Sequence, residues 1–157
     1  MSSDSNIHIQ IATEYDVKNI ANITRKSFIQ YCSAIGIDTV DALQESDKDI
    51  LDDIRKKIVY KIYWKERIVG SIRVEIKSEK ATISRFSILP EYQCLGIGSK
   101  MLSFVEQILV FAKIDWIELY SAVDNKRLKD FYISKGYKIL SIDNSKGYRR
   151  GLFQKKL

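Results

Sequence analysis

The sequence predicts a mixed α/β fold with one sheet of about seven strands, and three patterns carry that prediction. Strand-like and helix-like segments follow one another along 157 residues in the order β-α-α-β-β-β-α-β-α-β-β. Short charged turns join the strands of the central β-β-β run, which favours antiparallel pairing. The later strand–helix–strand run requires a crossover, which favours parallel pairing.

The composition is typical of one globular domain. Hydrophobic residues make up 45% of the chain, enough for a sizeable core at this length, so we expect a single domain over residues 1–157 with its core at about 7–156. No apolar run is long enough to span a bilayer, and residues 1–6 lack the features of a signal peptide, so we expect a cytoplasmic protein that binds no membrane. Cys32 and Cys94 are far apart and in no ligand spacing, which predicts reduced thiols and no metal site.

The first third of the chain predicts a strand and two helices. Isoleucines alternate with polar residues over 7–11, the pattern of a half-buried strand. Thr13 and Asp16 resemble a capping box, and the apolar stripe after them predicts a helix that ends at about Cys32. Two further helix starts are indicated at residues 38–39 and 46–47, the second leading into a buried stripe that reaches residue 58.

The middle of the chain predicts three strands, over 59–64, 68–76 and 81–89. In the third, the apolar residues Ala81 and Ile83 are out of phase with Phe86 and Ile88, so the alternation slips by one residue near Ser84–Arg85. A slip of this kind predicts a β-bulge.

The last third predicts a long helix from Gly98, a strand over 116–122, a short helix and a terminal hairpin. Asn125 is a natural cap for the short helix, and Gly136 would end it. The hairpin strands are expected over 137–142 and 148–154.

The most informative stretch is 90–99, PEYQCLGIGS, where a strand ends and the long helix begins. The N-terminus of a helix leaves backbone N–H groups without partners, and glycines let a ligand approach the backbone closely. Several donors can then converge on a diphosphate. The alternative is that the glycines only permit a tight turn.

The order of the elements and the motif Gln93-Cys94-Leu95-Gly96-Ile97-Gly98 resemble the GCN5-related N-acetyltransferase (GNAT) superfamily, whose signature is Gln/Arg-x-x-Gly-x-Gly/Ala between a strand and a long helix. The resemblance covers nearly the whole chain, because Pro90, Asn125, Phe131-Tyr132 and Gly136 also occur in family order. It implies a twisted mixed sheet flanked by four helices. It also implies that strands 4 and 5 splay apart to admit the pantetheine arm of coenzyme A.

The resemblance also assigns site residues. Main-chain groups of Ile88 and Leu89 would pair with the pantetheine arm, and one N–H there would polarise the thioester oxygen. Tyr132 would donate a proton to the departing thiolate, or serve only as a core aromatic residue. Asn125 would bond the cofactor arm, or act simply as a helix cap. The backbone expected to hold the diphosphate is that of Gln93, Cys94, Leu95, Gly96, Ile97, Gly98 and Ser99.

The implied function is an N-acetyltransferase that moves the acetyl group of acetyl-coenzyme A directly to a primary amine of an unidentified small molecule or peptide. The general base stays open, since the strand over 81–89 has no carboxylate where some family members carry a glutamate. The alternatives are Glu75, Glu118 and a water chain that ends on main-chain carbonyls or Tyr120, and no base is assigned. The missing carboxylate also motivates a second hypothesis, a non-catalytic acyl-coenzyme A sensor or assembly module.

The expected partners are acetyl-coenzyme A and an amine acceptor. The net charge is +6, but the basic residues are interspersed with acidic ones and the sequence contains no recognised nucleic-acid-binding motif. We therefore expect no nucleic acid among the partners. A homodimer is compatible with the fold, because exposed strand edges can pair. Acidic residues in the variable segments would favour a cationic acceptor, or belong simply to a solvated helix face. The candidate residues around the acceptor are Tyr31, Asp38, Asp41, Glu45, Tyr148 and Arg149.

Overall fold

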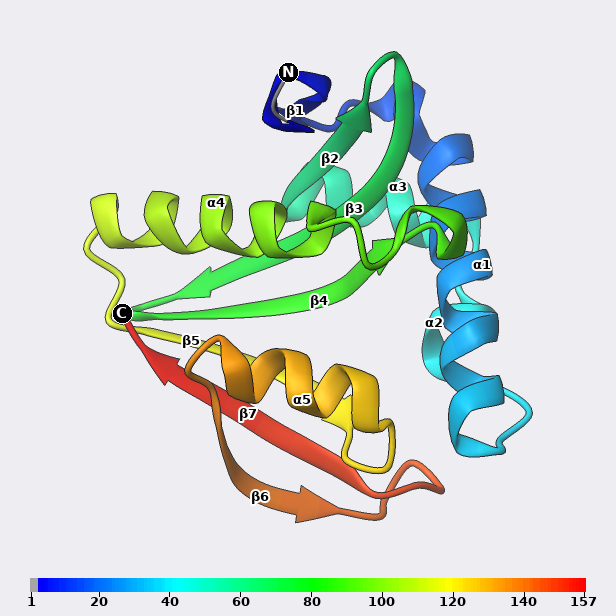
Figure 1. Ribbon diagram of the computed structural model, residues 1–157, viewed down its shortest axis with the longest axis vertical. Helices are drawn as coiled ribbons and strands as arrows, with labels where there is room; N and C mark the ends of the chain where they lie inside the picture. The colour runs from blue at the N-terminus through cyan, green and yellow to red at the C-terminus, as the bar shows by residue number, and fades with distance from the viewer. Residues whose placement is uncertain (1–2) are drawn as a thin grey trace.

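A computed structural model describes residues 3–157; Met1 and Ser2, part of the segment judged for a signal peptide, lie outside the described residues. Seven strands form one mixed sheet in the order β1-β2-β3-β4-β5-β7-β6, which confirms the expected fold class (Figure 1). The strands are β1 (Ile7–Ile11), β2 (Ile58–Trp64), β3 (Arg67–Lys77), β4 (Lys80–Ile88), β5 (Trp116–Ala122), β6 (Lys138–Asp143) and β7 (Arg150–Lys156).

Over residues 3–157 there are five α-helices, one more than the four expected. The additional one is α2, a four-residue segment that begins after Val40 and not at residues 38–39. Short 3-10 turns precede β1, α1 and α4 at residues 3–6, 14–16 and 90–92. The α-helices are α1 (Val17–Ile35), α2 (Asp41–Gln44), α3 (Asp47–Lys56), α4 (Ile97–Phe111) and α5 (Lys126–Ser134).

The predicted local signals start several of these elements. The Thr13 N–H donates to Asp16 Oδ2 at 2.7 Å, within the predicted capping box. Ser46 caps α3 by accepting a hydrogen bond from the Asp49 N–H. α1 runs past Cys32 to Ile35 and ends at Gly36, whose φ of 70° is the left-handed conformation that glycine adopts readily.

The helices cover both faces of the sheet. Figure 1 shows α4 and α5 lying across one face. The side chain of Val59 on β2 packs with Ile20 of α1 and Ile50 of α3, whereas its neighbour Tyr60 meets the ring of Phe104 on α4 at 5.3 Å. Because successive side chains of a strand point to opposite faces, α1 and α3 lie opposite α4.

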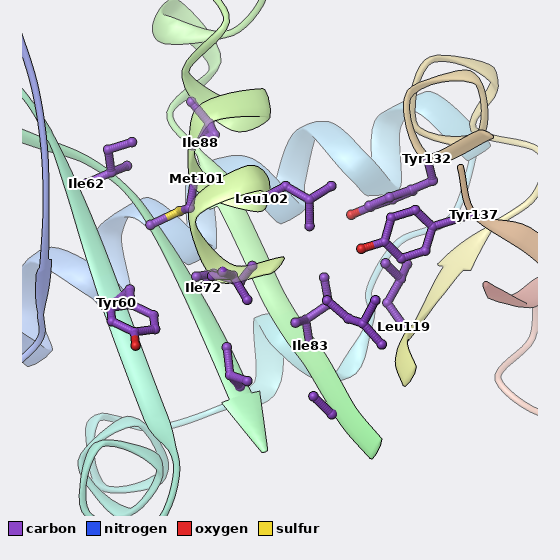
Figure 2. Close-up of a cluster of buried hydrophobic side chains, with 14 of the residues drawn as sticks. Tyr60, Ile62, Ile72, Ile83, Ile88, Met101, Leu102, Leu119, Tyr132 and Tyr137 are labelled. Carbon is purple, nitrogen blue, oxygen red and sulfur yellow. The ribbon is translucent and has the colours of Figure 1, made fainter. Parts of the chain in front are cut away.

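The larger core lies under α4 and α5. Met101 and Leu102 of α4 are fully buried and, as Figure 2 shows, lie close to Ile72 of β3. Toward α5 the core becomes aromatic, where the ring of Tyr132 packs against those of Tyr137 and Phe153. This core holds α4 and α5 on the two halves of the sheet that meet between β4 and β5.

β4 and β5 pair in parallel only at their starts, where Lys80–Thr82 lies beside Trp116–Glu118. Beyond these residues the two strands separate, so the expected splay is present. β4 also carries one more residue than β3 between two paired positions, and Arg85 there has a φ of 50°. The predicted β-bulge near Ser84–Arg85 is therefore confirmed.

Both cysteines are free thiols, Cys32 buried and Cys94 exposed. Within residues 3–157, no helix has the length and apolar character needed to cross a membrane. The same part of the chain contains no group of three or more histidine, cysteine or acidic side chains arranged to hold a metal ion.

Candidate active site

Two cavities open along the gap between β4 and β5. The α4 cavity, of about 220 Å³, lies at the start of α4 and beside α5. The α2 cavity, of about 400 Å³, is lined by α2, by the separated parts of β4 and β5, and by the loop between β6 and β7. The two cavities are adjacent, because they share the lining residues Phe28, Tyr31, Phe86, Leu128 and Tyr132.

α4 begins at the α4 cavity without a side-chain cap. Its N-cap residue is Gly96, with a φ of 83°, and the first turn contains no acidic residue. α3 and α5, by contrast, are capped by Ser46 and Asn125. The first N–H groups of α4 have no partner within the helix, and the helix dipole adds positive potential at the same place. This terminus is therefore suited to an anion.

The glycine-rich loop presents its backbone, and only some of its side chains reach the α4 cavity. Leu95 is exposed and Ile97 is buried in the core, and neither lines this cavity. Cys94 has a φ of 61°, which turns the chain just before the helix. The predicted residues that do line the α4 cavity are Gln93, Cys94, Gly96, Gly98 and Ser99.

The side chain of Gln93 connects the loop to its surroundings. Its Nε2 atom donates to the Ile88 carbonyl at 3.0 Å and to Oε1 of Gln30 on α1 at 2.7 Å. The amide of Gln93 therefore holds the loop against the end of β4 and against α1.

Ile88 and Leu89, which the sequence analysis grouped together, differ in their main-chain contacts. The Leu89 N–H donates to the Val69 carbonyl at 2.8 Å, and its carbonyl accepts from the Tyr92 N–H at 2.8 Å. Because peptide groups alternate in direction along a strand, those of Ile88 face the gap. Ile88 lines the α4 cavity and Leu89 lines neither cavity.

Sequence reasoning did not single out Phe86 as a site residue, yet it lines both cavities. Phe86 lies two residues before Ile88, and alternation from Ile88 was the signal that could have identified it. Together with Phe131, these side chains surround the position of Gly98. A methyl group on Gly98 would lie 3.7 Å from Phe86, 3.8 Å from Ile88 and 4.0 Å from Phe131.

Tyr132 lies where the two cavities meet, and its side chain is otherwise buried. Burial raises the pKa of its phenol, although the positive charge of Arg127 opposes the shift. The phenol is therefore protonated at neutral pH. Arg127 itself is an exposed residue that lines the α4 cavity, and the sequence analysis did not name it.

Asn125 is buried and accepts a hydrogen bond from the Leu128 N–H at 3.3 Å, so its side chain caps α5. It lines neither the α4 cavity nor the α2 cavity. The helix that carries Tyr132 is thus fixed at its start by an internal hydrogen bond.

The wall between the cavities is also fixed by Tyr31. Its hydroxyl accepts a hydrogen bond from the Ala122 N–H at 2.7 Å, at the end of β5. The Tyr31 ring lies 5.4 Å from that of Phe28 and 6.2 Å from that of Tyr148. Burial, with a smaller effect from Tyr148, raises the pKa of the Tyr31 phenol. α1 and the β6–β7 loop are therefore anchored on the same edge of the gap.

The carboxylates considered as general bases lie elsewhere. Glu75 forms ion pairs with Lys57 and Lys77, Glu118 forms one with Lys80, and neither glutamate lines the α4 or the α2 cavity.

Only part of the expected acceptor surface is assembled at the α2 cavity. Tyr31, Asp41 and Tyr148 line it, together with the alternative base Tyr120. Asp38, Glu45 and Arg149 do not.

A buried ion cluster supports the α2 cavity from behind. Arg73 of β3 is fully buried and donates to Glu45 at 2.7 and 2.8 Å and to Asp53 at 2.9 Å. Burial alone would lower the pKa of Arg73, but these two carboxylates reverse the shift. Glu45 also accepts from Nε of Arg85 at 3.2 Å. The cluster thus ties the α2–α3 junction to the bulge in β4.

Known proteins match this chain in both sequence and fold. The profile of the acetyltransferase (GNAT) domain matches residues 55–139, more than half of the chain. The uncharacterized protein YyaT of Bacillus subtilis is 29% identical over 135 residues, covering 84% of this chain and 82% of that protein. The PaiA N-acetyltransferase of Thermoplasma acidophilum, solved in complex with coenzyme A, aligns over 100% of both chains with a TM-score of 0.83 and 22% identity.

A second solved structure, Ard1 of Thermoplasma volcanium, aligns over 97% of this chain and 98% of its own with a TM-score of 0.79 and 18% identity. At these identities the solved structures establish a shared fold. The fold, with its splayed strands and glycine-rich helix start, is that of an acetyltransferase. The chain belongs to the GNAT acetyltransferase family.

Proposed function

We propose that this protein transfers the acetyl group of acetyl-coenzyme A directly to a primary amine, with both substrates bound at once. In this proposal the cofactor occupies the α4 cavity and the amine enters from the α2 cavity. The adjacent cavities support it, since a molecule in one cavity and a molecule in the other would both contact Tyr132. Holding both reactants in this way supplies a large part of the rate.

The diphosphate is assigned to the backbone of residues 93–99. The support is the uncapped start of α4, with its unpartnered N–H groups and no acidic residue in the first turn. Arg127 at the rim of the same cavity adds a cation that can reach a phosphate. The side chain of Gln93 is assigned a positioning role, because its amide already contacts Ile88 and Gln30.

The pantetheine arm is assigned to the free edge of β4. The Ile88 N–H faces the gap, and the Ile88 carbonyl accepts from the side chain of Gln93, whereas both main-chain groups of Leu89 are bonded to the main chain of Val69 and Tyr92. The proposed pairing therefore uses Ile88, with Phe86 as the next position on the same side of the strand. The Ile88 N–H is the proposed donor to the thioester oxygen as negative charge develops there.

The chemistry follows from these positions. A neutral amine attacks the thioester carbon, a C–N bond forms, and the C–S bond breaks to release the thiolate of coenzyme A. The phenol of Tyr132, whose pKa is raised by burial and which is therefore protonated at neutral pH, donates its proton to the sulfur. The proton released by the nitrogen then restores the phenol.

The observation that carries the proposal is the position of Tyr132 at the junction of the two cavities. Two measurements test it: calorimetric titration of acetyl-coenzyme A, and release of free thiol when the purified protein receives acetyl-coenzyme A and a panel of amines. We expect saturable binding and thiol release that depends on the amine.

Tight cofactor binding without thiol release from any amine would support the alternative, a non-catalytic acyl-coenzyme A sensor. Absence of cofactor binding would contradict both functions. Faster turnover with propionyl- or succinyl-coenzyme A would correct the donor and leave the site assignment intact.

The proposal treats residues 1–157 as one catalytic domain and routes no step through a metal ion. Dialysis against a chelator should therefore leave the rate of thiol release unchanged. A loss of rate that added divalent metal restores would contradict this part of the proposal.

A further inference from the structure

The charged residues around the α2 cavity are unevenly distributed. Arg85, Lys146 and Arg150 line it, and Asp41 is the single acidic residue among its lining residues. The cofactor phosphates of the proposed function belong to the other cavity, at the start of α4. The three cations of the α2 cavity therefore face a different molecule, the acceptor.

The single carboxylate is not available to an ammonium group. Lys146 donates to Oδ2 of Asp41 at 3.0 Å, and this bond lowers the pKa of Asp41. The carboxylate is thus ionised and already paired. A polycationic acceptor would find no unpaired carboxylate among the lining residues of this cavity and would meet the excess positive charge of Arg85 and Arg150, which is unfavourable.

Two of the cations retain donors for a ligand. The contact of Arg85 with Glu45 uses its Nε atom, so the terminal nitrogens of the guanidinium remain for another partner. Arg150 pairs with Asp143 at 3.5 Å through one terminal nitrogen, and its Nε is buried without a hydrogen-bond partner among the described residues. Its guanidinium carbon lies over the ring of Tyr120, 4.4 Å from the centroid.

From this arrangement we propose that the acceptor is a small primary amine that also carries a carboxylate or phosphate group, bound by Arg85 and Arg150. The inference rests on the proposed function and specifies its second substrate. Planar guanidinium groups bind carboxylates and phosphates through paired hydrogen bonds. The volume of about 400 Å³ suits a small molecule, and the rings of Phe28, Tyr120 and Tyr148 supply apolar walls for its body.

The test uses pairs of amines that differ only in the anionic group. L-phenylalanine is compared with 2-phenylethylamine for the carboxylate, O-phosphoethanolamine with ethanolamine for the phosphate, and spermidine serves as the polycation. We expect kcat/KM at least about 10-fold higher for the anionic member of one pair or both, because a charge-assisted hydrogen bond is lost in the other member. The pair with the larger ratio identifies which anionic group is preferred.

Arg85→Gln and Arg150→Gln should each lower kcat/KM for the anionic acceptor about 10- to 100-fold and change the neutral one little. Arg55→Gln is the matched control, since Arg55 is an exposed residue of α3 that pairs with Glu14. The affinity for coenzyme A, measured by calorimetry, should be the same in all three variants. An unchanged affinity excludes collapse of the fold as the cause.

The inference would be overturned if the neutral amine of each pair, or spermidine, were acetylated with the same kcat/KM as the anionic amines. The proposed function would still stand. An equal loss of kcat/KM for both members of a pair in Arg85→Gln and Arg150→Gln would also overturn the inference. Titration of each amine into protein saturated with coenzyme A gives a second readout that does not depend on turnover. If no amine releases thiol, the titration still shows whether the anionic amines bind more tightly than the neutral ones, so it tests the inference separately from the proposed function.

Discussion

The rings of Tyr132 and Tyr137 meet edge to face with their centroids 5.7 Å apart (Figure 2), yet of these two tyrosines only Tyr132 is among the lining residues of the α4 and α2 cavities. The hydroxyl of Tyr137 is buried with no hydrogen-bond partner among the described residues. Two neighbouring phenols thus have different surroundings, which provides a matched pair for testing the proposed proton donor.

Tyr132→Phe should lower kcat about 100-fold, because general acid catalysis typically contributes between two and four powers of ten. The affinity for coenzyme A should not change, since no binding contact is assigned to the hydroxyl. Tyr137→Phe is the control. It should leave kcat unchanged and raise the free energy of unfolding by about 1 kcal/mol, because it removes a buried unpaired hydroxyl. Equal kcat values for Tyr132→Phe and the wild type would rule out the assigned acid.

Gly98→Ala should separate folding from cofactor binding. The added methyl group would make ordinary contacts with Phe86, Ile88 and Phe131, and alanine favours helix over glycine by about 1 kcal/mol, so the melting temperature should hold or rise. The methyl group would nevertheless occupy the lining of the α4 cavity, and the Kd for coenzyme A should rise at least about 10-fold. Ser103→Ala, on the exposed side of α4, is the matched control and should change neither quantity.

Arg73→Leu should destabilise the fold by about 3–5 kcal/mol, because it leaves the carboxylates of Glu45 and Asp53 without their buried partner. Arg67→Leu on the same strand removes an exposed ion pair with Glu91 and should cost less than about 1 kcal/mol. Urea unfolding measures the change in the free energy of unfolding for both variants. Similar losses in the two variants would show that the buried cluster adds nothing beyond a surface pair.

The protein should lose stability at alkaline pH. Burial raises the pKa of Tyr31, Tyr132 and Tyr137, so these phenols stay protonated in the folded chain at pH values where they ionise in the unfolded chain. Their contribution is complete below the ordinary tyrosine pKa of about 10 and declines as the pH rises above it.

The expected decline is about 1.4 kcal/mol per pH unit for each such phenol. Urea unfolding of the wild type and of Tyr132→Phe between pH 8 and roughly pH 11 isolates one of them, since all other groups titrate alike in both proteins. The stability of the wild type relative to the variant should fall as the pH rises. A constant difference across this range would contradict the prediction.

The fold was largely predictable because its signals are local. The isoleucine alternation of β1, the capping residues Thr13 and Ser46, and the phase slip at Ser84–Arg85 each depend on neighbouring residues, and each is present in the structure. The end of α1 was misplaced by about one turn, because the helix continues past the buried Cys32 through Ser33, Ala34 and Ile35 and ends only at the left-handed residue Gly36.

The candidate site was less predictable, because it depends on register and on distant segments. Phe86, Ile88 and Leu89 are all apolar, so only the pairing of Leu89 with Val69 reveals which peptide groups face the gap. Arg85 and Arg150 come from strands far apart in the chain, and no motif links them. The acidic residues expected to select a cationic acceptor are instead outnumbered by cations at the α2 cavity.

The short pairing of β4 with β5 has a mechanical consequence. Strands β1–β4 form one half of the sheet and β5–β7 the other, and within the described chain the two halves pair only near the starts of β4 and β5, at Glu79–Thr82 and Asp115–Glu118. In the proposed function the pantetheine arm of coenzyme A pairs with the free edge of β4 and would connect the two halves as an added strand. Amide protons near Ile88 should consequently exchange with deuterium more slowly in the loaded protein, while those of β1 and β6 at the outer margins keep their rates.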